Sequence, residues 1–339
     1  MDKIKLGLIG LGRMGKRYAD IIQNKVKNAD IIAVCSVNDK ELDYARYEMS
    51  VPYTFSNHTQ MLELNELDAV MIISSTIQHA RHMIDVIEAG YHVFCEKPLA
   101  LSVEDCQRAI KAADTKPSQL CVVGFNRRFD QSYMYANEKI REGLIGEPFL
   151  VKSQTVDKDT SAGFQANYVQ NSGGIFLDYN AHDVDLARWY LNSEFTHVYS
   201  IGGSFKHEVF AQMGDADNVM TIGKLENGTM AHIVASRTAA HGHDTYTEIT
   251  GTEGTLRIGR PAGQNLVEIY DSNGARREIM ATFLDRFKDS FELQIQTFVN
   301  NVQAGNKMSF SLRDALEATR VGVAMTKSFM LKQEVKIER

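Results

Sequence analysis

Short apolar runs alternate with amphipathic stretches over the first 125 residues of the chain. The stretches 11–24 and 77–90 repeat their apolar residues with the period of a helix. Runs without a polar face are typical of strands buried on both sides, as in a parallel sheet between two layers of helices. The pattern therefore predicts a doubly wound α/β domain over residues 1–125. Its expected strands are 3–10, 30–37, 67–75, 91–98 and 119–125.

The pattern changes at about residue 126. Apolar and polar residues now alternate in short runs between 195 and 271, which is typical of antiparallel strands with one solvated face. We therefore expect residues 126–339 to form an α+β domain on an open, mainly antiparallel sheet. Its last helices either stay with this domain or pack back on the first one. The expected helices are 131–142, 180–192, 286–304 and 312–331, and the expected turns are 226–229, 251–254 and 271–274.

The composition is that of a soluble globular protein with two domains, since 44% of the 339 residues are apolar and 24% are charged. The formal net charge of −6 argues against nucleic acids and anionic membranes as partners. The start does not resemble a signal peptide, and no apolar run approaches the roughly 20 residues of a membrane span. The four cysteines lack CxxC spacing, so we expect reduced thiols, no metal site and a cytoplasmic location.

The segment GLGRMG links the first expected strand to a helix and has the GxGxxG spacing at Gly10, Gly12 and Gly15. Gly10 permits a tight turn, Gly12 lets the backbone approach a pyrophosphate, and Gly15 lets the helix pack closely on the strand. The helix N-terminus attracts the phosphate charge. An ordinary glycine turn is the alternative, but the strand–loop–helix context favours a dinucleotide site.

The end of the second strand bears on the choice of dinucleotide. NAD-selective sites usually have an acidic residue there, whereas this chain has Ser36. Arg13 in the glycine loop is expected on the side where a 2′-phosphate would lie. Asn38 or Asp39 could still bind the ribose. The predicted cofactor is NAD or NADP, with NADP tolerated or preferred.

A second motif, GGIFLDYNAHDVDLARW at 173–189, places Asp178 and His182 one helical turn apart on one face. Four interpretations are open: a helix cap at Asp178, a metal-binding pair, a buried polar contact and an acid–base couple. No third ligand of suitable spacing supports a metal. Asp183 and Asp185 are expected to pair with Arg188 or to face solvent, and Asp183 could also touch a substrate.

With EKPLA at 96–100 also in view, the chain resembles the glucose–fructose oxidoreductase, inositol dehydrogenase and rhizopine-catabolism (Gfo/Idh/MocA) family. The resemblance covers nearly the whole chain, and inositol 2-dehydrogenases are the members that it resembles most. It implies a Rossmann domain and a second domain whose open sheet carries the substrate site and an oligomer interface. It also implies a cis bond between Lys97 and Pro98. An exposed sheet face in the second domain would favour a homodimer or homotetramer, because large apolar patches rarely stay exposed.

The resemblance assigns roles to individual residues. In inositol dehydrogenases of this family the EKP lysine, an aspartate and a histidine four residues later act together, and they correspond here to Lys97, Asp178 and His182. The expected cofactor-binding residues are Gly10, Gly12, Arg13, Met14, Gly15, Ser36, Ser74, Ser75, His79, Glu96 and Lys97.

The family motif GFxRR, whose first arginine approaches the substrate, is matched by GFNRR. Arg127 is therefore an expected substrate-binding residue, with a salt bridge to Asp130 as the alternative. The segment RTAAHGHD departs from the family, because it has His241 and His243 where some inositol enzymes have tyrosines near the substrate. Both histidines are candidate substrate contacts or ordinary loop residues.

Oxidation of a secondary alcohol needs a hydride acceptor, a base for the hydroxyl proton and stabilisation of the forming alkoxide. A nicotinamide supplies the first. His182 suits the second because an imidazole titrates near pH ~6.5, and Asp178 could hold its ring in one tautomer. Lys97, at the carboxyl end of a parallel strand, could stabilise the alkoxide. A proton relay between Lys97 and His182 stays open.

The predicted function is NAD(P)-dependent oxidation of a ring hydroxyl of a cyclic polyol, with myo- or scyllo-inositol as the best candidate and a keto-inositol as product. The alternative within the family is a dehydrogenase of an aldose such as glucose or xylose. The alternative from another class is a cofactor-binding regulator without activity. That class is expected to lack Lys97 or His182, and this chain has both.

Overall fold

The computed structural model describes residues 2–160, 169, 171–259 and 263–339. The chain divides into two compact units. The first contains Met1–Asn126 and Phe291–Thr319, and the second contains Arg127–Ser290 and Arg320–Arg339. The boundary after Asn126 adjoins the expected end of the first domain, whereas residues 291–319 group with the first unit although they come late in the chain.

A six-stranded parallel sheet forms the centre of the first unit and confirms the predicted doubly wound fold. The strand order β3-β2-β1-β4-β5-β6 reverses its direction between β1 and β4. At such a switch point the carboxyl ends of the strands bind ligands in this class of fold. The strands are β1 (Ile4–Ile9), β2 (Ala29–Cys35), β3 (Tyr53–Phe55), β4 (Ala69–Ile72), β5 (His92–Cys95) and β6 (Cys121–Val123).

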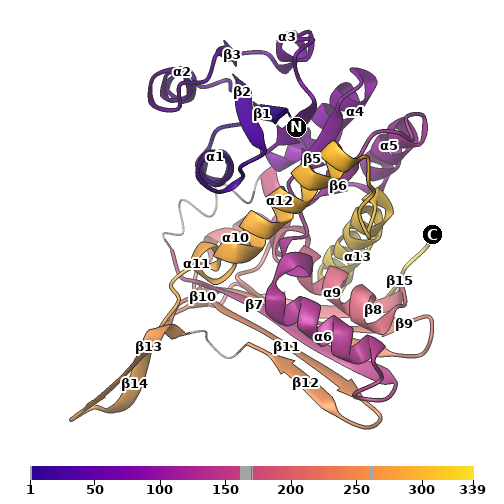
Figure 1. Cartoon of the computed structure of the whole chain (residues 1–339). Coiled ribbons are helices and arrows are strands. Elements are labelled where there is room, and N and C mark those ends of the chain that lie inside the picture. Colours follow the sequence, from indigo (N-terminus) through magenta and orange to yellow (C-terminus); the bar gives the residue numbers. More distant parts are fainter. Residues whose placement is uncertain (1, 161–168, 170, 260–262) are drawn as a thin grey trace. The chain divides into compact units, whose positions relative to one another are not determined.

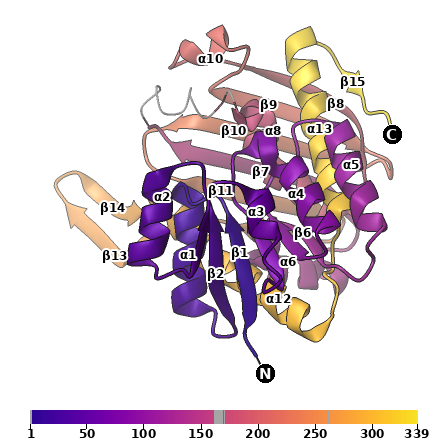
Figure 2. The same ribbon diagram turned by 90° about the horizontal axis from the view of Figure 1, so that it is seen from above.

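Helices cover both faces of this sheet; several are seen with β1 and β2 in Figure 2. They are α1 (Arg13–Lys25), α2 (Asp39–Asp43), α3 (His58–Leu62), α4 (His79–Glu88), α5 (Val103–Asp114), α12 (Lys288–Ala304) and the first part of α13 (Leu312–Leu331). The ring of Phe94 on β5 lies 5.7 Å from Tyr18 on α1 and 5.8 Å from Phe298 on α12. The next residue, Cys95, points to the opposite face of the sheet and is fully buried, as is Cys106 on α5.

Helix α12 completes the core of the first unit from the far end of the sequence. The ring of Phe291 lies 5.8 Å from that of Tyr18, and Gln294 Nε2 donates a hydrogen bond of 3.2 Å to the Tyr18 hydroxyl. Both Phe298 and Gln294 are fully buried. The apolar face of this helix therefore substitutes for a helix that the first 126 residues do not provide.

The second unit is built on a seven-stranded sheet in the order β12-β11-β7-β10-β9-β8-β15. Only β7 and β10 pair in parallel among these strands, which confirms the predicted mainly antiparallel sheet. The strands are β7 (Pro148–Lys158), β8 (Phe195–Gly203), β9 (Asn218–Leu225), β10 (Met230–Ala239), β11 (Asp244–Gly251), β12 (Thr255–Ile258) and β15 (Val335–Lys336). A separate hairpin, β13 (Gly263–Asp271) and β14 (Gly274–Ile279), extends away from this sheet (Figure 1).

Two helices, α6 (Gln131–Arg141) and α9 (Ala181–Leu191), lie on one face of this sheet (Figure 1). The hydroxyl of Tyr190 on α9 donates to the backbone oxygen of Tyr133 on α6 at 3.0 Å. The hydroxyl of Tyr133 lies 3.2 Å from Thr247 Oγ1 on β11. Shorter helices are α8 (Gly174–Asp178), α10 (Val209–Gln212) and α11 (Phe283–Arg286).

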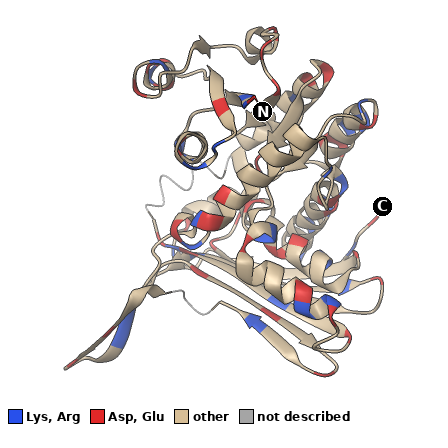
Figure 3. Cartoon of the chain, viewed as in Figure 1, with Lys and Arg blue, Asp and Glu red and all other residues tan. Residues whose placement is uncertain are grey.

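Charged residues of both signs are interspersed along the helices of each unit (Figure 3). Within the described part of the chain, no helix combines the length and apolar character that crossing a membrane requires. All four cysteines are free thiols, and burial raises the pKa of Cys35 to about 11 and that of Cys121 to about 12.

Candidate functional site

The glycine loop between β1 and α1 has the backbone that a dinucleotide site requires. Gly10 has φ +94°, and a β-carbon there would lie 2.6 Å from the backbone oxygen of Ile73. A β-carbon on Gly15 would lie 2.3 Å from the backbone oxygen of Gly10. Both contacts are too short for any side chain. The N-cap residue of α1, Gly12, provides no side-chain cap, and the first helical turn has no acidic residue.

The space beside Gly12 is open in the way that a pyrophosphate needs. A β-carbon built on Gly12 would meet a single neighbour within 4 Å among the described residues, Oε1 of Glu41 at 3.9 Å. Backbone N–H groups at the start of α1 can therefore bind a phosphate. Arg13 is exposed at the start of this helix and Met14 is half-buried. These features fit an NAD-type cofactor.

A carboxylate that sequence reasoning missed lies beside the end of β2. Ser36 is buried, and its hydroxyl donates a hydrogen bond of 2.6 Å to Oε2 of Glu41 on α2. Asn38 caps α2, because its side chain accepts from the backbone N–H of Lys40 at 3.1 Å. The signal available in the sequence was Glu41, an acidic residue in the first turn of the helix that begins four residues after the last residue of the strand.

Histidines surround the end of β4. Ser74 Oγ lies 3.0 Å from Nδ1 of His82, and Ser75 is exposed. Burial, reinforced by the neighbouring His58, lowers the pKa of His82 to about 4, so this ring is neutral at pH 7. His79 is 2% exposed, and its two ring nitrogens contact the backbone oxygens of Pro98 and Ser74 at 2.8 and 3.1 Å. His79 is thus placed to fix the two loops that contain Ser74 and Pro98.

The EKP segment follows β5. The peptide bond between Lys97 and Pro98 is cis, which confirms the expectation. The hydroxyl of Tyr18 donates to Oε1 of Glu96, and the backbone N–H of Lys97 donates to Oε2 of the same carboxylate at 2.9 Å. Glu96 therefore holds the backbone of the lysine, and Gln294 supports Tyr18 in turn. The Lys97 side chain is half-buried at the carboxyl end of the strand.

Asp178 and His182 lie on two short helices instead of one. Asp178 is the last residue of α8, and α9 begins at Ala181 with Asn180 as its N-cap. The helix-cap interpretation of Asp178 is therefore wrong, because the N-cap of α9 is Asn180 and Asp178 is the last residue of the preceding helix. Asp178 is 5% exposed and His182 is half-buried. Among the described residues, no three His, Cys, Asp or Glu side chains lie together as a metal site would require.

Asp183 is fully buried at the centre of a polar network. Its Oδ1 lies 2.7 Å from Nη1 of Arg127 and accepts from Ser153 Oγ at 2.6 Å. Its Oδ2 accepts from Thr155 Oγ1 at 2.8 Å and from Asn180 Nδ2 at 3.2 Å. The expectation that Asp183 faces solvent or pairs with Arg188 is wrong, because β7 and Arg127 enclose it.

Asp185 is 2% exposed and pairs with Arg128 at 2.7 Å, with Arg188 farther away at 4.0 Å. Arg188 instead binds Glu194 through two hydrogen bonds of 2.6 Å. The expectation that Asp185 faces solvent or has Arg188 as its main partner is therefore corrected.

Arg127 is 3% exposed, and its second guanidinium nitrogen donates to Thr155 Oγ1 at 2.5 Å. The salt bridge to Asp130 that was its alternative is also not formed. Asp130 caps α6 and pairs with Arg286 at 2.6 Å. Because Asp183 and Thr155 engage Arg127, we do not propose it as a substrate contact.

The two histidines of RTAAHGHD differ sharply in exposure. His243 is buried, with Nδ1 2.6 Å from Oδ1 of Asp157 and Nε2 in contact with Thr245 Oγ1. The His241 side chain is 53% exposed, and it lies 3.5 Å from Asp244. His241 is thus the one of the pair with a side chain accessible to a ligand.

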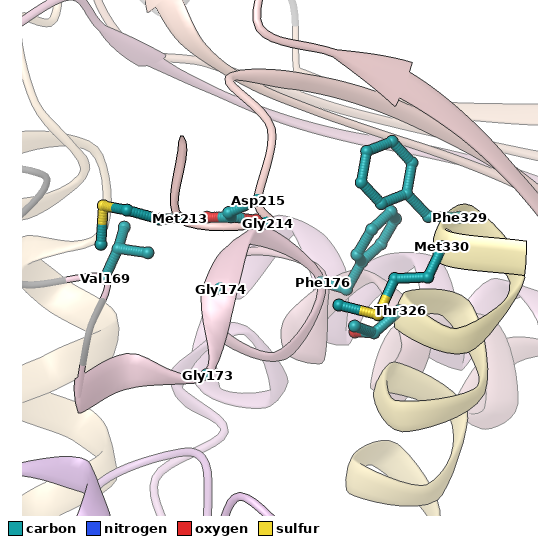
Figure 4. A pocket seen from close by; sticks show the side chains of 10 residues that line it. All are labelled: Val169, Gly173, Gly174, Phe176, Met213, Gly214, Asp215, Thr326, Phe329 and Met330. Atoms are coloured by element: carbon teal, nitrogen blue, oxygen red, sulfur yellow. The ribbon is translucent and has the colours of Figure 1, made fainter. Parts of the chain in front are cut away.

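A cavity of about 430 Å³ lies beside the start of α8 in the second unit (Figure 4). Phe176 and Phe329, with ring centroids 5.7 Å apart, stand on one side, and Met213 stands on the other. Asp215 is the one carboxylate among the described lining residues, and it pairs with Arg237 at 2.7 Å. The lining is mainly apolar and includes neither Asp178 nor His182, so it does not suit a polyol.

Family models and known proteins match both parts of the chain. The family model described as oxidoreductase family, NAD-binding Rossmann fold, matches residues 4–125. The model of the GFO/IDH/MocA C-terminal domain matches residues 133–257. The chain is 32% identical to myo-inositol 2-dehydrogenase of Thermotoga maritima, covering 99% of each chain. It is 33% identical to scyllo-inositol 2-dehydrogenase (NAD(+)) of Bacillus subtilis, covering 96% of this chain and 94% of that one.

Solved structures have the same fold as this chain over 99% of its length. Myo-inositol 2-dehydrogenase from Lactobacillus plantarum superposes with a TM-score of 0.96 at 30% identity, covering 99% of this chain and all of that one. Scyllo-inositol dehydrogenase from Lactobacillus casei with bound NAD(H) and scyllo-inositol has a TM-score of 0.94 at 34% identity, covering 99% of both chains.

Proposed function

Because this chain belongs to the Gfo/Idh/MocA family of NAD-binding oxidoreductases, we propose that it oxidises a ring hydroxyl of myo- or scyllo-inositol to the keto-inositol with NAD. The observation that carries the proposal is the similarity over 99% of the chain to an enzyme solved with NAD(H) and scyllo-inositol. The glycine loop and the open space at Gly12 support it independently.

We assign the proton chemistry to three side chains. When bound, the nicotinamide accepts the hydride. His182 takes the proton of the reacting hydroxyl, and Asp178, four residues earlier, orients the imidazole. Lys97 stabilises the negative charge that develops on the substrate oxygen. Glu96 is a positioning residue, because its carboxylate holds the backbone N–H of Lys97.

The cofactor contacts follow from the strand ends of the first unit. We retain Gly10, Gly12, Arg13, Met14, Gly15, Ser36, Ser74, Ser75 and Lys97 as contacts, with Glu96 and His79 as supports. The preference for NADP was expected because Ser36 stands at the end of β2, where NAD-selective sites have a carboxylate, and because Arg13 lies in the glycine loop. Glu41 supplies a carboxylate at that place, so we propose NAD as the physiological cofactor. The four free thiols, three of them buried, agree with a cytoplasmic enzyme.

Assay with a panel of polyols tests the function. Initial rates of NAD reduction are measured with myo-inositol, scyllo-inositol, glucose and xylose. The proposal expects the highest kcat/KM for one of the two inositols. A higher value for an aldose supports the alternative within the family, and no turnover of any compound contradicts the dehydrogenase assignment.

We further propose that an apolar sheet face in the second unit pairs with a second copy of the chain. Ile201 and Met220 are neighbours across β8 and β9, as are Tyr199 and Ile222, and all four side chains are exposed. Contiguous apolar patches rarely stay exposed in monomers. Sedimentation analysis is expected to show a homodimer or homotetramer, and Ile222→Glu is expected to shift it to smaller species. A monomeric wild type would refute the proposal.

A further inference from the structure

The carboxylate of Glu41 stands where the second strand of the first unit meets the glycine loop. Its Oε2 accepts the 2.6 Å hydrogen bond from Ser36, the residue that directly follows β2. Its Oε1 is 3.9 Å from the position of a β-carbon on Gly12. One oxygen is thus tied to the strand end, and the other lies beside the loop that receives the pyrophosphate.

In dinucleotide-binding domains of this fold an acidic residue at the end of the second strand binds the hydroxyls of the adenosine ribose. Here the residue after the strand is Ser36, and the acidic group, Glu41, comes instead from α2. A carboxylate has about four acceptor positions, so the bond from Ser36 leaves others for ribose hydroxyls. The Ser36–Glu41 pair therefore reproduces the chemistry of a strand-end acid with two residues.

The two neighbouring candidates are less suitable for the ribose. The side-chain oxygen of Asn38 caps α2 through the N–H of Lys40. Asp39 is exposed as the first residue of α2. Glu41 is half-buried and anchored by a short hydrogen bond. Its position is the better defined of the three.

We propose that Glu41 determines cofactor specificity, binding the adenosine ribose of NAD and excluding the 2′-phosphate of NADP, with Ser36 as its positioning residue. This inference rests on the proposed function, because it presupposes a dinucleotide in the glycine loop. The physical reason is that a phosphate dianion beside a fixed carboxylate suffers like-charge repulsion. The attraction offered by Arg13 at the loop does not remove this repulsion, since Arg13 lies exposed to solvent and its charge is screened.

Binding measurements without turnover test the proposal. Dissociation constants for NAD, NADP, 5′-AMP and adenosine 2′,5′-bisphosphate are measured by calorimetry for the wild type and for Glu41→Gln. The wild type is expected to bind NAD about 100-fold more tightly than NADP. In Glu41→Gln, NAD binding weakens and NADP binding tightens, so that the ratio falls below about tenfold. The two mononucleotides should show the same change, because they differ only at the ribose 2′ position.

Two further variants separate a direct role from a general disturbance. Ser36→Ala removes the hydrogen bond that fixes the carboxylate, and it should lower the preference for NAD less than Glu41→Gln does. Asp39→Asn removes one negative charge from the same short helix and should leave the ratio unchanged. An effect of Asp39→Asn equal to that of Glu41→Gln would mean that net charge, not position, sets the specificity.

The outcomes separate this inference from the proposed function on which it rests. If the wild type binds NAD and Glu41→Gln leaves the NAD/NADP ratio unchanged, the inference is overturned while the dehydrogenase assignment stands. If the ratio shifts as expected but no polyol is oxidised, the inference stands and the substrate proposal fails. If the wild type binds neither dinucleotide, both are overturned.

Discussion

Replacing Lys97 or His182 by alanine is expected to lower kcat by a factor of about 10² or more, because positioned acid–base groups typically contribute 10²–10⁴-fold. Binding of NAD should weaken far less than kcat falls, since the glycine loop receives the pyrophosphate and Lys97 supplies one cofactor contact among several. Steady-state rates with the preferred inositol give kcat, and calorimetry gives the dissociation constant of NAD. The two measurements together separate chemistry from cofactor binding.

Matched controls come from other lysines and histidines of the same units. Lys111 is exposed on α5, and His197 lies on β8 beside Thr196. Alanine at either position should leave kcat within about twofold, as expected of surface substitutions away from a site. Near-normal turnover of Lys97→Ala or His182→Ala would remove that residue from the proposed mechanism.

Replacing Asp183 by asparagine is expected to destabilise the second unit by about 3–5 kcal/mol, because it leaves the buried guanidinium of Arg127 without its counter-charge. The Arg127 and Asp183 side chains are 3% and 0% exposed, so solvent cannot compensate for the loss. Calorimetric scans should show a fall in Tm of about 6 °C or more for a unit of this size.

Two comparisons make this prediction specific. Glu142→Gln breaks the surface ion pair with Lys139, in which the nitrogen and the carboxylate oxygen lie 2.7 Å apart, and should leave Tm nearly unchanged because solvent screens this pair. The double variant Arg127→Leu with Asp183→Asn removes the orphaned charge and should be more stable than Asp183→Asn alone. An equal loss for Asp183→Asn and Glu142→Gln would show that burial does not strengthen this pair.

Hydrophobic patterning predicted the first unit well because its strands have no polar face. The run at 67–75 contains β4, and the run at 91–98 contains β5. The expected helix 312–331 coincides with α13, which is divided between the two units, and in the second unit the three expected turns join the strands of three hairpins. Such signals are local. A turn or an amphipathic helix depends on residues that are neighbours in the sequence.

Features that depend on distant partners were missed. Strand β7 lies inside its sheet between β10 and β11, yet these partners come about 80–100 residues later in the chain, so no local pattern indicates that position. Asp183 sits in a helix pattern that suggested a solvated face, and only Arg127, Ser153 and Thr155 explain its burial. Buried polar groups need such partners, and sequence spacing alone does not identify them.

Some contacts between cofactor-binding residues were also missed, although the residues are close together in the sequence. The glycine spacing located the loop between β1 and α1, because the motif carries its own backbone requirements. The spacing does not reveal the hydrogen bond between Ser36 and Glu41. The acidic group need not occupy the strand end, because the side chain of Glu41, five residues after Ser36 in the first turn of α2, reaches the same place.

Helix α12 has a consequence for the biosynthesis of this protein. Phe291, Gln294 and Phe298 pack against Tyr18 and Phe94, and they leave the ribosome long after the sheet that they cover. During translation the nascent N-terminal sheet therefore lacks part of its apolar cover until some 300 residues have been synthesised. The Tyr18–Glu96–Lys97 hydrogen bonds gain the support of Gln294 at the same late stage, so the backbone position of Lys97 is among the last features of the first unit to be fixed.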